Sequence, residues 1–169
     1  MDDFGETTIS WRPVCRGVFS QWVADIELGI QSERMEIANE EQVTRHFGEW
    51  PSFHDAEVIS IETRRGEAPG EYADLLASIH VRRYTPANVG TAQFEMEKTH
   101  DALISLRFRS ISELNLSGFN HQNVIDDLVF LEEGERVRVT FESIFGVECT
   151  FSCAQVGVVA VMNRMQANA

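Results

Sequence analysis

Apolar and polar residues alternate with a period of two along most of the chain after residue 56. In the clearest case, one face carries Ala102, Ile104, Leu106 and Phe108 and the other carries Ser105, Arg107 and Arg109. Because neighbouring side chains of a strand point to opposite faces, this pattern predicts half-buried strands, and the short glycine-containing turns between them favour antiparallel pairing. The expected strands are Glu57–Thr63, Ala73–Tyr84, Thr91–Met96, Ala102–Ile111, Leu114–Leu116, Asp127–Leu131, Arg136–Phe141, Val147–Cys153 and Val156–Met162.

One helix signal precedes these strands. Asn39 can cap a helix over Glu40–Phe47, which opens with acidic residues and closes with basic ones, as the helix dipole favours. Gly48 then ends the helix. We therefore expect an α+β, mostly β fold, in which one N-terminal helix packs on an antiparallel sheet of about six to eight strands.

The part of the chain before the helix has a different character. Residues 1–34 lack a clear period apart from a short strand expected at Thr7–Trp11. We interpret 1–34 as an N-terminal extension, 35–162 as a single β-rich domain and 163–169 as a frayed tail. Charged residues interrupt the most apolar early stretch, 14–30, so we expect neither a membrane span nor a secretory leader.

The charge balance is strongly acidic. The chain has 27 acidic against 14 basic residues and a formal net charge of −13. Nucleic-acid binding requires a cationic surface, so this composition argues against it. The composition suits a protein that attracts a basic partner, although acidity that serves only solubility is an equally good reading.

The three cysteines indicate a reducing compartment. Cys149 and Cys153 lie four residues apart, on one face of an expected strand, with Cα atoms roughly 13 Å apart. That separation is too long for a disulfide. We interpret both as small buried apolar residues, and Cys15 as a packing residue, which favours a cytoplasmic location.

A first polar cluster lies in the segment Trp50–Val58, which reads WPSFHDAEV. His54, Asp55 and Glu57 could hold a metal, act as general acid and base, or contact a partner. In an extended strand, however, Asp55 and Glu57 share a face while His54 points the other way. Hydrogen bonds that fix the entry into a strand are the simplest role for these residues.

A second polar cluster places Asn120, Gln122 and Asn123 among the apolar residues of Gly118–Ile125. Asparagine side chains hydrogen-bond their own backbone and tolerate the left-handed conformation, so this cluster predicts a turn. The same three amides could also read a ligand or a partner's backbone. All six residues of the two clusters are therefore candidate binding residues.

Signatures of known enzyme sites are missing from the sequence. It contains no Gly-x-Ser-x-Gly elbow, no phosphate-binding glycine loop, no His-Glu-x-x-His and no Cys-x-x-Cys. We therefore expect no catalytic residues, no metal and no cofactor.

The two clusters together resemble landmarks of a known family. Trp50–Val58, Leu106–Phe108, Phe119–Ile125 and Gly146–Cys153 are similar to motifs of the immunity protein 50 family of bacterial polymorphic toxin systems. The resemblance covers roughly Met35 to Met162, and residues 1–34 have no counterpart in it. It implies a protein that binds and neutralises a cognate protein toxin, with a basic nuclease as one candidate.

Two other functions fit the residues. A metal-binding protein or hydrolase could use His54, Asp55 and Glu57, joined by His80, His100 or His121 from adjacent strands. A structural subunit could instead pair with copies of itself through an exposed strand edge.

Overall fold

The structure is a computed structural model that describes residues 35–66 and 72–165. The extension 1–34, with the strand expected at Thr7–Trp11 and with Cys15, lies outside the described residues, as do residues 67–71 and the end of the expected tail.

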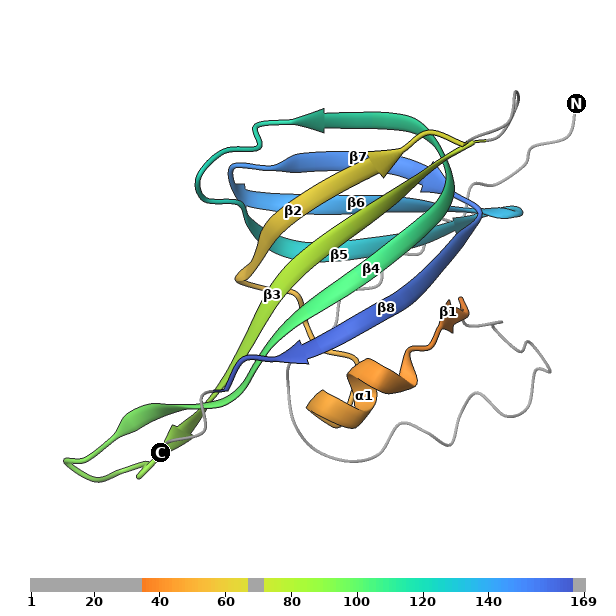
Figure 1. Cartoon of the computed structure of the whole chain (residues 1–169). Coiled ribbons are helices and arrows are strands. Elements are labelled where there is room, and N and C mark those ends of the chain that lie inside the picture. Colours follow the sequence, from red (N-terminus) through yellow and green to blue (C-terminus); the bar gives the residue numbers. More distant parts are fainter. Residues whose placement is uncertain (1–34, 67–71, 166–169) are drawn as a thin grey trace, which may run out of the picture. The chain divides into compact units, whose positions relative to one another are not determined.

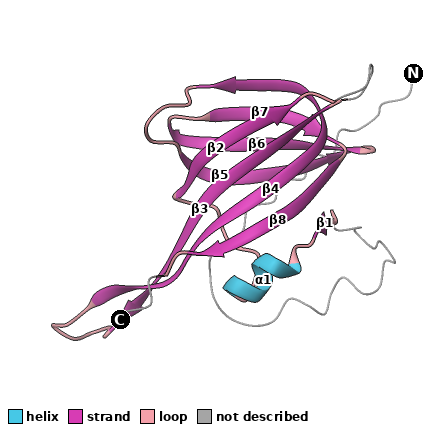
Figure 2. Ribbon diagram, in the orientation of Figure 1, coloured by secondary structure: helices cyan, strands magenta, loops and turns pink. Residues whose placement is uncertain are grey.

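The described chain forms eight strands and one short helix on their N-terminal side (Figures 1 and 2). The expected mostly β, α+β fold is therefore confirmed. The elements are β1 (Ile37–Ala38), α1 (Glu41–Phe47), β2 (Ala56–Arg64), β3 (Ala73–Ala87), β4 (Glu95–Ser117), β5 (Val124–Glu133), β6 (Arg136–Phe145), β7 (Glu148–Cys153) and β8 (Gln155–Asn163).

One continuous sheet makes two layers (Figure 1). The front layer consists of β2, β3, β4 and β8, and the back layer of β5, β6 and β7. β4 joins the layers because it pairs with β8 over residues 102–109 and with β7 over residues 112–117. A short pairing of β2 with β5 joins them a second time.

β4 is longer than the sequence pattern indicated. The expected segments Ala102–Ile111 and Leu114–Leu116 are parts of the single strand Glu95–Ser117, and the expected strand Thr91–Met96 begins only at Glu95. Ser110 and Glu113 adopt left-handed backbone angles, with φ of 54° and 55°. These angles and the shifts of pairing register beside them interrupt the alternation where β4 bends from one layer into the other.

One short strand was not expected. β1 pairs in parallel with β8, through Ile37 with Val156 and Ala38 with Gly157. The sheet is therefore mixed, and the expectation of a wholly antiparallel sheet was wrong at this edge. A strand of two residues is too short to show the alternation of apolar and polar positions, so the sequence pattern does not predict it.

The helix is confirmed, but its expected cap is wrong. Gly48 ends α1 in the left-handed conformation, with φ of 83°. At the other end Glu40 occupies the capping position, and no side chain makes a capping hydrogen bond. Asn39 has a φ of 60° and donates its side-chain amide to the Val158 carbonyl of β8, at 3.3 Å. Its side chain thus links the turn after β1 to the sheet. In the described residues no helix is long and apolar enough to cross a bilayer.

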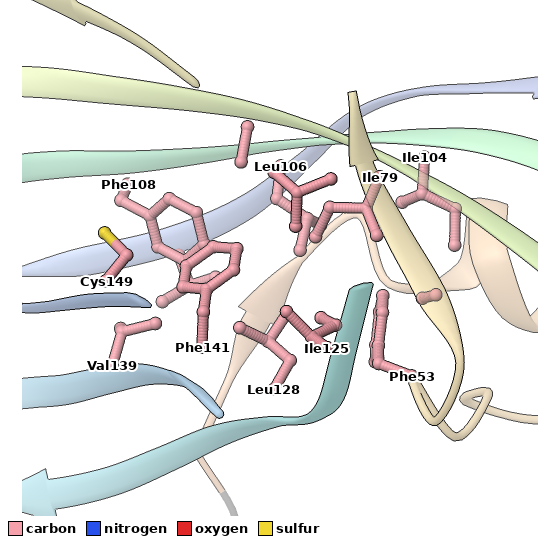
Figure 3. Packing of buried hydrophobic residues seen from close by; sticks show 14 of the residues in the cluster. Phe53, Ile79, Ile104, Leu106, Phe108, Ile125, Leu128, Val139, Phe141 and Cys149 are labelled. Atoms are coloured by element: carbon pink, nitrogen blue, oxygen red, sulfur yellow. The ribbon is translucent and has the colours of Figure 1, made fainter. Parts of the chain in front are cut away.

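The core lies between the two layers (Figure 3). The ring centroids of Phe108 from the front layer and Phe151 from the back layer are 4.9 Å apart, at a near-perpendicular angle. Cys149 and Cys153 are free and buried in this core, as expected. Burial raises the pKa of the Cys149 thiol to about 12 and that of Cys153 to about 11, so both remain protonated and unreactive at neutral pH.

Candidate functional site

The fold brings the two polar clusters of the sequence together. β2 and β5 pair only at their first residues, where Ala56 lies opposite Ile125 and Glu57 opposite Val124. The Val58 amide then donates to the Asn123 carbonyl at 2.8 Å. Segments more than 60 residues apart in sequence therefore meet at one end of the domain.

The loop that contains the second polar cluster, Gly118–Asn123, is here called the amide loop. Most of its side-chain hydrogen bonds are made within the loop itself. The backbone N–H of Asn120 donates to the Asn123 side-chain oxygen at 2.9 Å, and the Asn123 side-chain nitrogen donates to the Asn120 carbonyl at 2.8 Å. The Asn120 side chain accepts from the Gln122 N–H and donates to the Gly118 carbonyl. The turn expected from the sequence is confirmed, and the contacts of Asn120 and Asn123 hold its shape.

Two glycines let this loop lie directly against the turn between β6 and β7. A Cβ atom on Gly118 would stand 2.2 Å from the Gly146 carbonyl oxygen. A Cβ atom on Gly146 would stand 2.2 Å from the Gln122 carbonyl oxygen. Both glycines also have positive φ angles, so no other residue fits either position without displacing backbone.

His54 lies between two carboxylates. Its Nδ1 atom is 2.7 Å from Asp126 and its Nε2 atom is 3.5 Å from Asp55, and all three side chains are more than half exposed. The hydrogen bond to Asp126 and the charge of Asp55 raise the pKa of His54 above its ordinary value. At mildly acidic pH this histidine is therefore a cation that holds the two carboxylates together.

The three residues of the first cluster do not converge. Asp55 lies in the turn before β2 with a φ of 60°, while Glu57 is already part of the strand. Asp55 therefore lies outside the strand, as the expected start at Glu57 implied, and the shared face of an extended strand does not apply to it. No group of three or more His, Cys, Asp or Glu residues able to hold a metal exists among residues 35–66 and 72–165.

The other histidines have separate neighbours. His80 contacts Asp101, with 2.6 Å between Nε2 and Oδ1, and the ring of His100 packs against Phe47. His121 lies near Phe145, with ring centroids 6.5 Å apart.

Bulges in three strands shape this end of the domain. Shifts of pairing register leave Ile59 of β2, Asp126 of β5 and Ile144 of β6 as the extra residues. A bulge re-aims the side chain it carries, and Asp126 reaches His54 in this way. Ile144 and the adjacent Phe145 are each half exposed.

Carboxylates gather at the same end without any arginine or lysine. Segments 53–58, 114–127 and 141–149 contain no basic residue except His54 and His121. Asp127 and Glu142 stand directly opposite each other on β5 and β6, an arrangement that costs stability because like charges repel. We call this region the acidic end, and its carboxylates are Asp55, Glu57, Asp126, Asp127, Glu142 and Glu148.

Four of these six carboxylates, including Glu148 at the start of β7, were not candidates from the sequence. Asp126, Asp127 and Glu142 sit within strands whose other residues alternate normally, so each looks like an ordinary outward-facing polar residue. In the sequence, the consecutive pair Asp126–Asp127 was the signal that could have indicated a bulge in this strand. Two adjacent residues cannot both face outward in a regular strand unless one of them is bulged.

The protein is a small β-sheet domain in which the two polar clusters form part of the acidic end. The described residues contain no group of side chains able to hold a metal ion. The family model for Immunity protein 50 matches residues 39–163, so the chain belongs to that family. Searches of curated proteins and of solved structures found no match.

Proposed function

We propose that this protein binds a cognate bacterial toxin and neutralises it by protein–protein contact, in the cytoplasm and without catalysis or a cofactor. The observation that carries the proposal is the family match over residues 39–163, because that family consists of immunity proteins.

We further propose that the acidic end meets the toxin. It combines six carboxylates with exposed apolar side chains, namely Phe119, Ile144 and Phe145. Exposed apolar groups rimmed by charge mark interaction sites, and a few desolvated aromatic anchors commonly dominate the lifetime of a complex.

The six candidate residues then have two kinds of role. The internal hydrogen bonds of Asn120 and Asn123 support the shape of the loop, which presents Phe119, His121 and Gln122. His54, Asp55 and Glu57 lie on the surface that the partner would cover. Metal binding and hydrolysis gain no support, because the first cluster does not converge.

The proposed partner has a basic surface, as a nuclease that grips phosphates would have. A chain with a net charge of −13 accelerates encounter with such a partner, and salt weakens that acceleration. An inhibitor with this charge could cover the nucleic-acid groove itself.

The test measures binding kinetics against the cognate toxin domain, to be sought first among the genes that flank this one, across a salt series from about 50 to 500 mM. We expect Asp127→Asn and Glu142→Gln to lower the association rate several-fold at low salt and to leave the dissociation rate nearly unchanged. The matched control is Glu135→Gln, an exposed carboxylate in the β5–β6 turn beyond the far ends of both strands.

Two results would contradict the proposal. If Glu135→Gln lowers the association rate as much as Glu142→Gln does, the acidic end has no special role. If association is indifferent to salt over the whole range, the acidity serves solubility and not encounter.

A further inference from the structure

The tips of β3 and β4 form an arm that leaves the body of the sheet (Figure 1). β2 pairs with β3 only as far as His80, and β8 pairs with β4 only from Ala102 onward. Within the described residues, the ribbon from Tyr84 to Lys98 is therefore two-stranded, with both outer edges unpaired. Four strand residues at ~3.3 Å each carry it roughly 13 Å outward before the loop begins.

The arm has two chemically different faces. Tyr84 lies opposite Lys98 and Pro86 opposite Met96, which places these four side chains on one face. Thr85 and Ala87 pair with Glu97 and Glu95 on the other face. The first face is mainly apolar and the second carries both carboxylates of the arm.

The apolar face is open to solvent. Tyr84 and Met96 on this face, and Phe94 in the loop just before β4, are 48%, 54% and 56% exposed. An isolated two-stranded ribbon gains little stability from its own pairing. Large apolar side chains on such a ribbon do not contribute to the core, so the fold alone does not explain them.

A bulge at the root sets this arrangement of faces. The pairing register moves by two residues on β4 and by one on β3 between Arg83 and Tyr84, which leaves Thr99 as the extra residue. The Thr99 hydroxyl donates to the Arg83 carbonyl at 3.2 Å. Because of the bulge, Met96 joins Tyr84 on one face, and Glu95 and Glu97 take the other.

An ion network around the buried residues Asp101 and His80 fixes the root on the outer face of the sheet. Asp101 accepts from Lys98 at 2.6 Å and lies 2.6 Å from His80 Nε2. Arg82 donates to His80 Nδ1 at 3.1 Å, and since a guanidinium can only donate, the histidine proton lies on Nε2 and points at Asp101. Burial pushes the pKa of Asp101 upward, but the bonds from Lys98 and His80 outweigh it and keep the pKa below its ordinary value.

Helix α1 fixes the root from the opposite face. Arg83 donates to the Phe47 carbonyl at 3.2 Å and to Glu49 at 3.0 Å, and its guanidinium lies over the Phe47 ring. The His100 ring packs on Phe47 as well. With both faces of the root tied down, the arm projects in a set direction, which lowers the entropy lost on binding.

We propose that this arm enters a concave site on the toxin, with Tyr84, Phe94 and Met96 on an apolar floor and Glu95 and Glu97 against a basic rim. The inference rests on the proposed function. The charge of the arm favours a basic partner, because residues 84–98 contain two glutamates and one lysine, and that lysine is paired with Asp101 at the root.

The same charge argues against a second copy of this chain as the occupant. Two arms paired edge to edge would bring the glutamates of both copies close together, and each chain carries a net charge of −13. Charged residues on an open strand edge oppose such pairing. The arm also continues from the end of the front layer where β2 begins, next to the acidic end.

The test uses the full chain and the same cognate toxin domain. We expect the double variant Phe94→Ser with Met96→Ser to bind at least 10-fold more weakly, mainly through faster dissociation. The matched control is Leu131→Ser, an exposed apolar residue at the far end of β5. Both variants should melt at the wild-type temperature, since neither site belongs to the core.

A photoreactive p-benzoylphenylalanine at position 94 supplies an independent readout. We expect it to cross-link to the toxin domain, whereas the same group at position 72, exposed just before the opposite end of β3, should not. Wild-type affinity in the double variant, or cross-linking only to a second copy or within the chain, overturns the inference and leaves the proposed function standing. If the wild-type protein itself fails to bind the toxin domain, both fail.

Discussion

At the residue scale, the roles of several polar side chains follow from where the strands begin and bulge. The amide loop was predictable, because Asn and Gly in close succession favour turns whatever surrounds them. The contact of His54 with Asp126 was not, because it depends on a register shift between β5 and β6. Local sequence patterns report a residue's own conformation and carry no information on which distant strand will lie beside it.

The first prediction concerns His54. Its pKa should lie above 6.5 in the native protein and should fall further in Asp126→Asn than in Asp55→Asn, because the bond to Asp126 is the larger cause of the shift. Since the folded pKa is raised, the stabilising contribution is complete below pH 6.5 and is lost as pH rises through the folded value. An NMR titration of the histidine ring signals measures the pKa of His54. An unchanged pKa in Asp126→Asn would show that His54 does not contact Asp126 in solution.

At the element scale, β4 determines the architecture. Its position in both layers depends on the bend at Ser110, where Asp74 accepts from the Ser110 N–H at 3.0 Å. Arg136 donates to the Ser110 carbonyl, the Ser112 hydroxyl and the Ser152 carbonyl. The sequence predicted the strands on either side of the bend but not their continuity. Alternation fails where the backbone turns left-handed, and the arginine that supports the bend comes from β6.

The second prediction concerns that bend. Arg136→Met should destabilise the fold by about 1–3 kcal/mol, because it leaves two half-buried carbonyls without their donor. Arg138→Met is the matched control on the same strand, since its ion pairs with Glu113 and Glu133 are exposed and worth about 0–1 kcal/mol. Urea unfolding of both variants measures the two losses in the free energy of unfolding. Equal losses of stability would show that the bend is held by packing alone.

At the scale of the whole molecule, charge and apolar surface are distributed unevenly. The acidic end carries six carboxylates without arginine or lysine, whereas Arg64, Arg65, Arg107 and Arg109 lie together around a shallow hollow on the outer face of the sheet. The net charge of −13 indicated a basic partner. It could not say where that partner would bind, because the distribution depends on the pairing of strands that are distant in sequence.

The most direct test of the central claim is neutralisation in living cells. The cognate toxin domain is produced in a bacterial host with wild-type protein, with Asp127→Asn plus Glu142→Gln, or with Glu135→Gln, and growth is recorded together with the amount of soluble protein. We expect full growth with wild type and with Glu135→Gln, and reduced growth with the acidic-end variant at low expression. Arrested growth in the presence of abundant, folded wild-type protein would show that the protein does not neutralise this toxin.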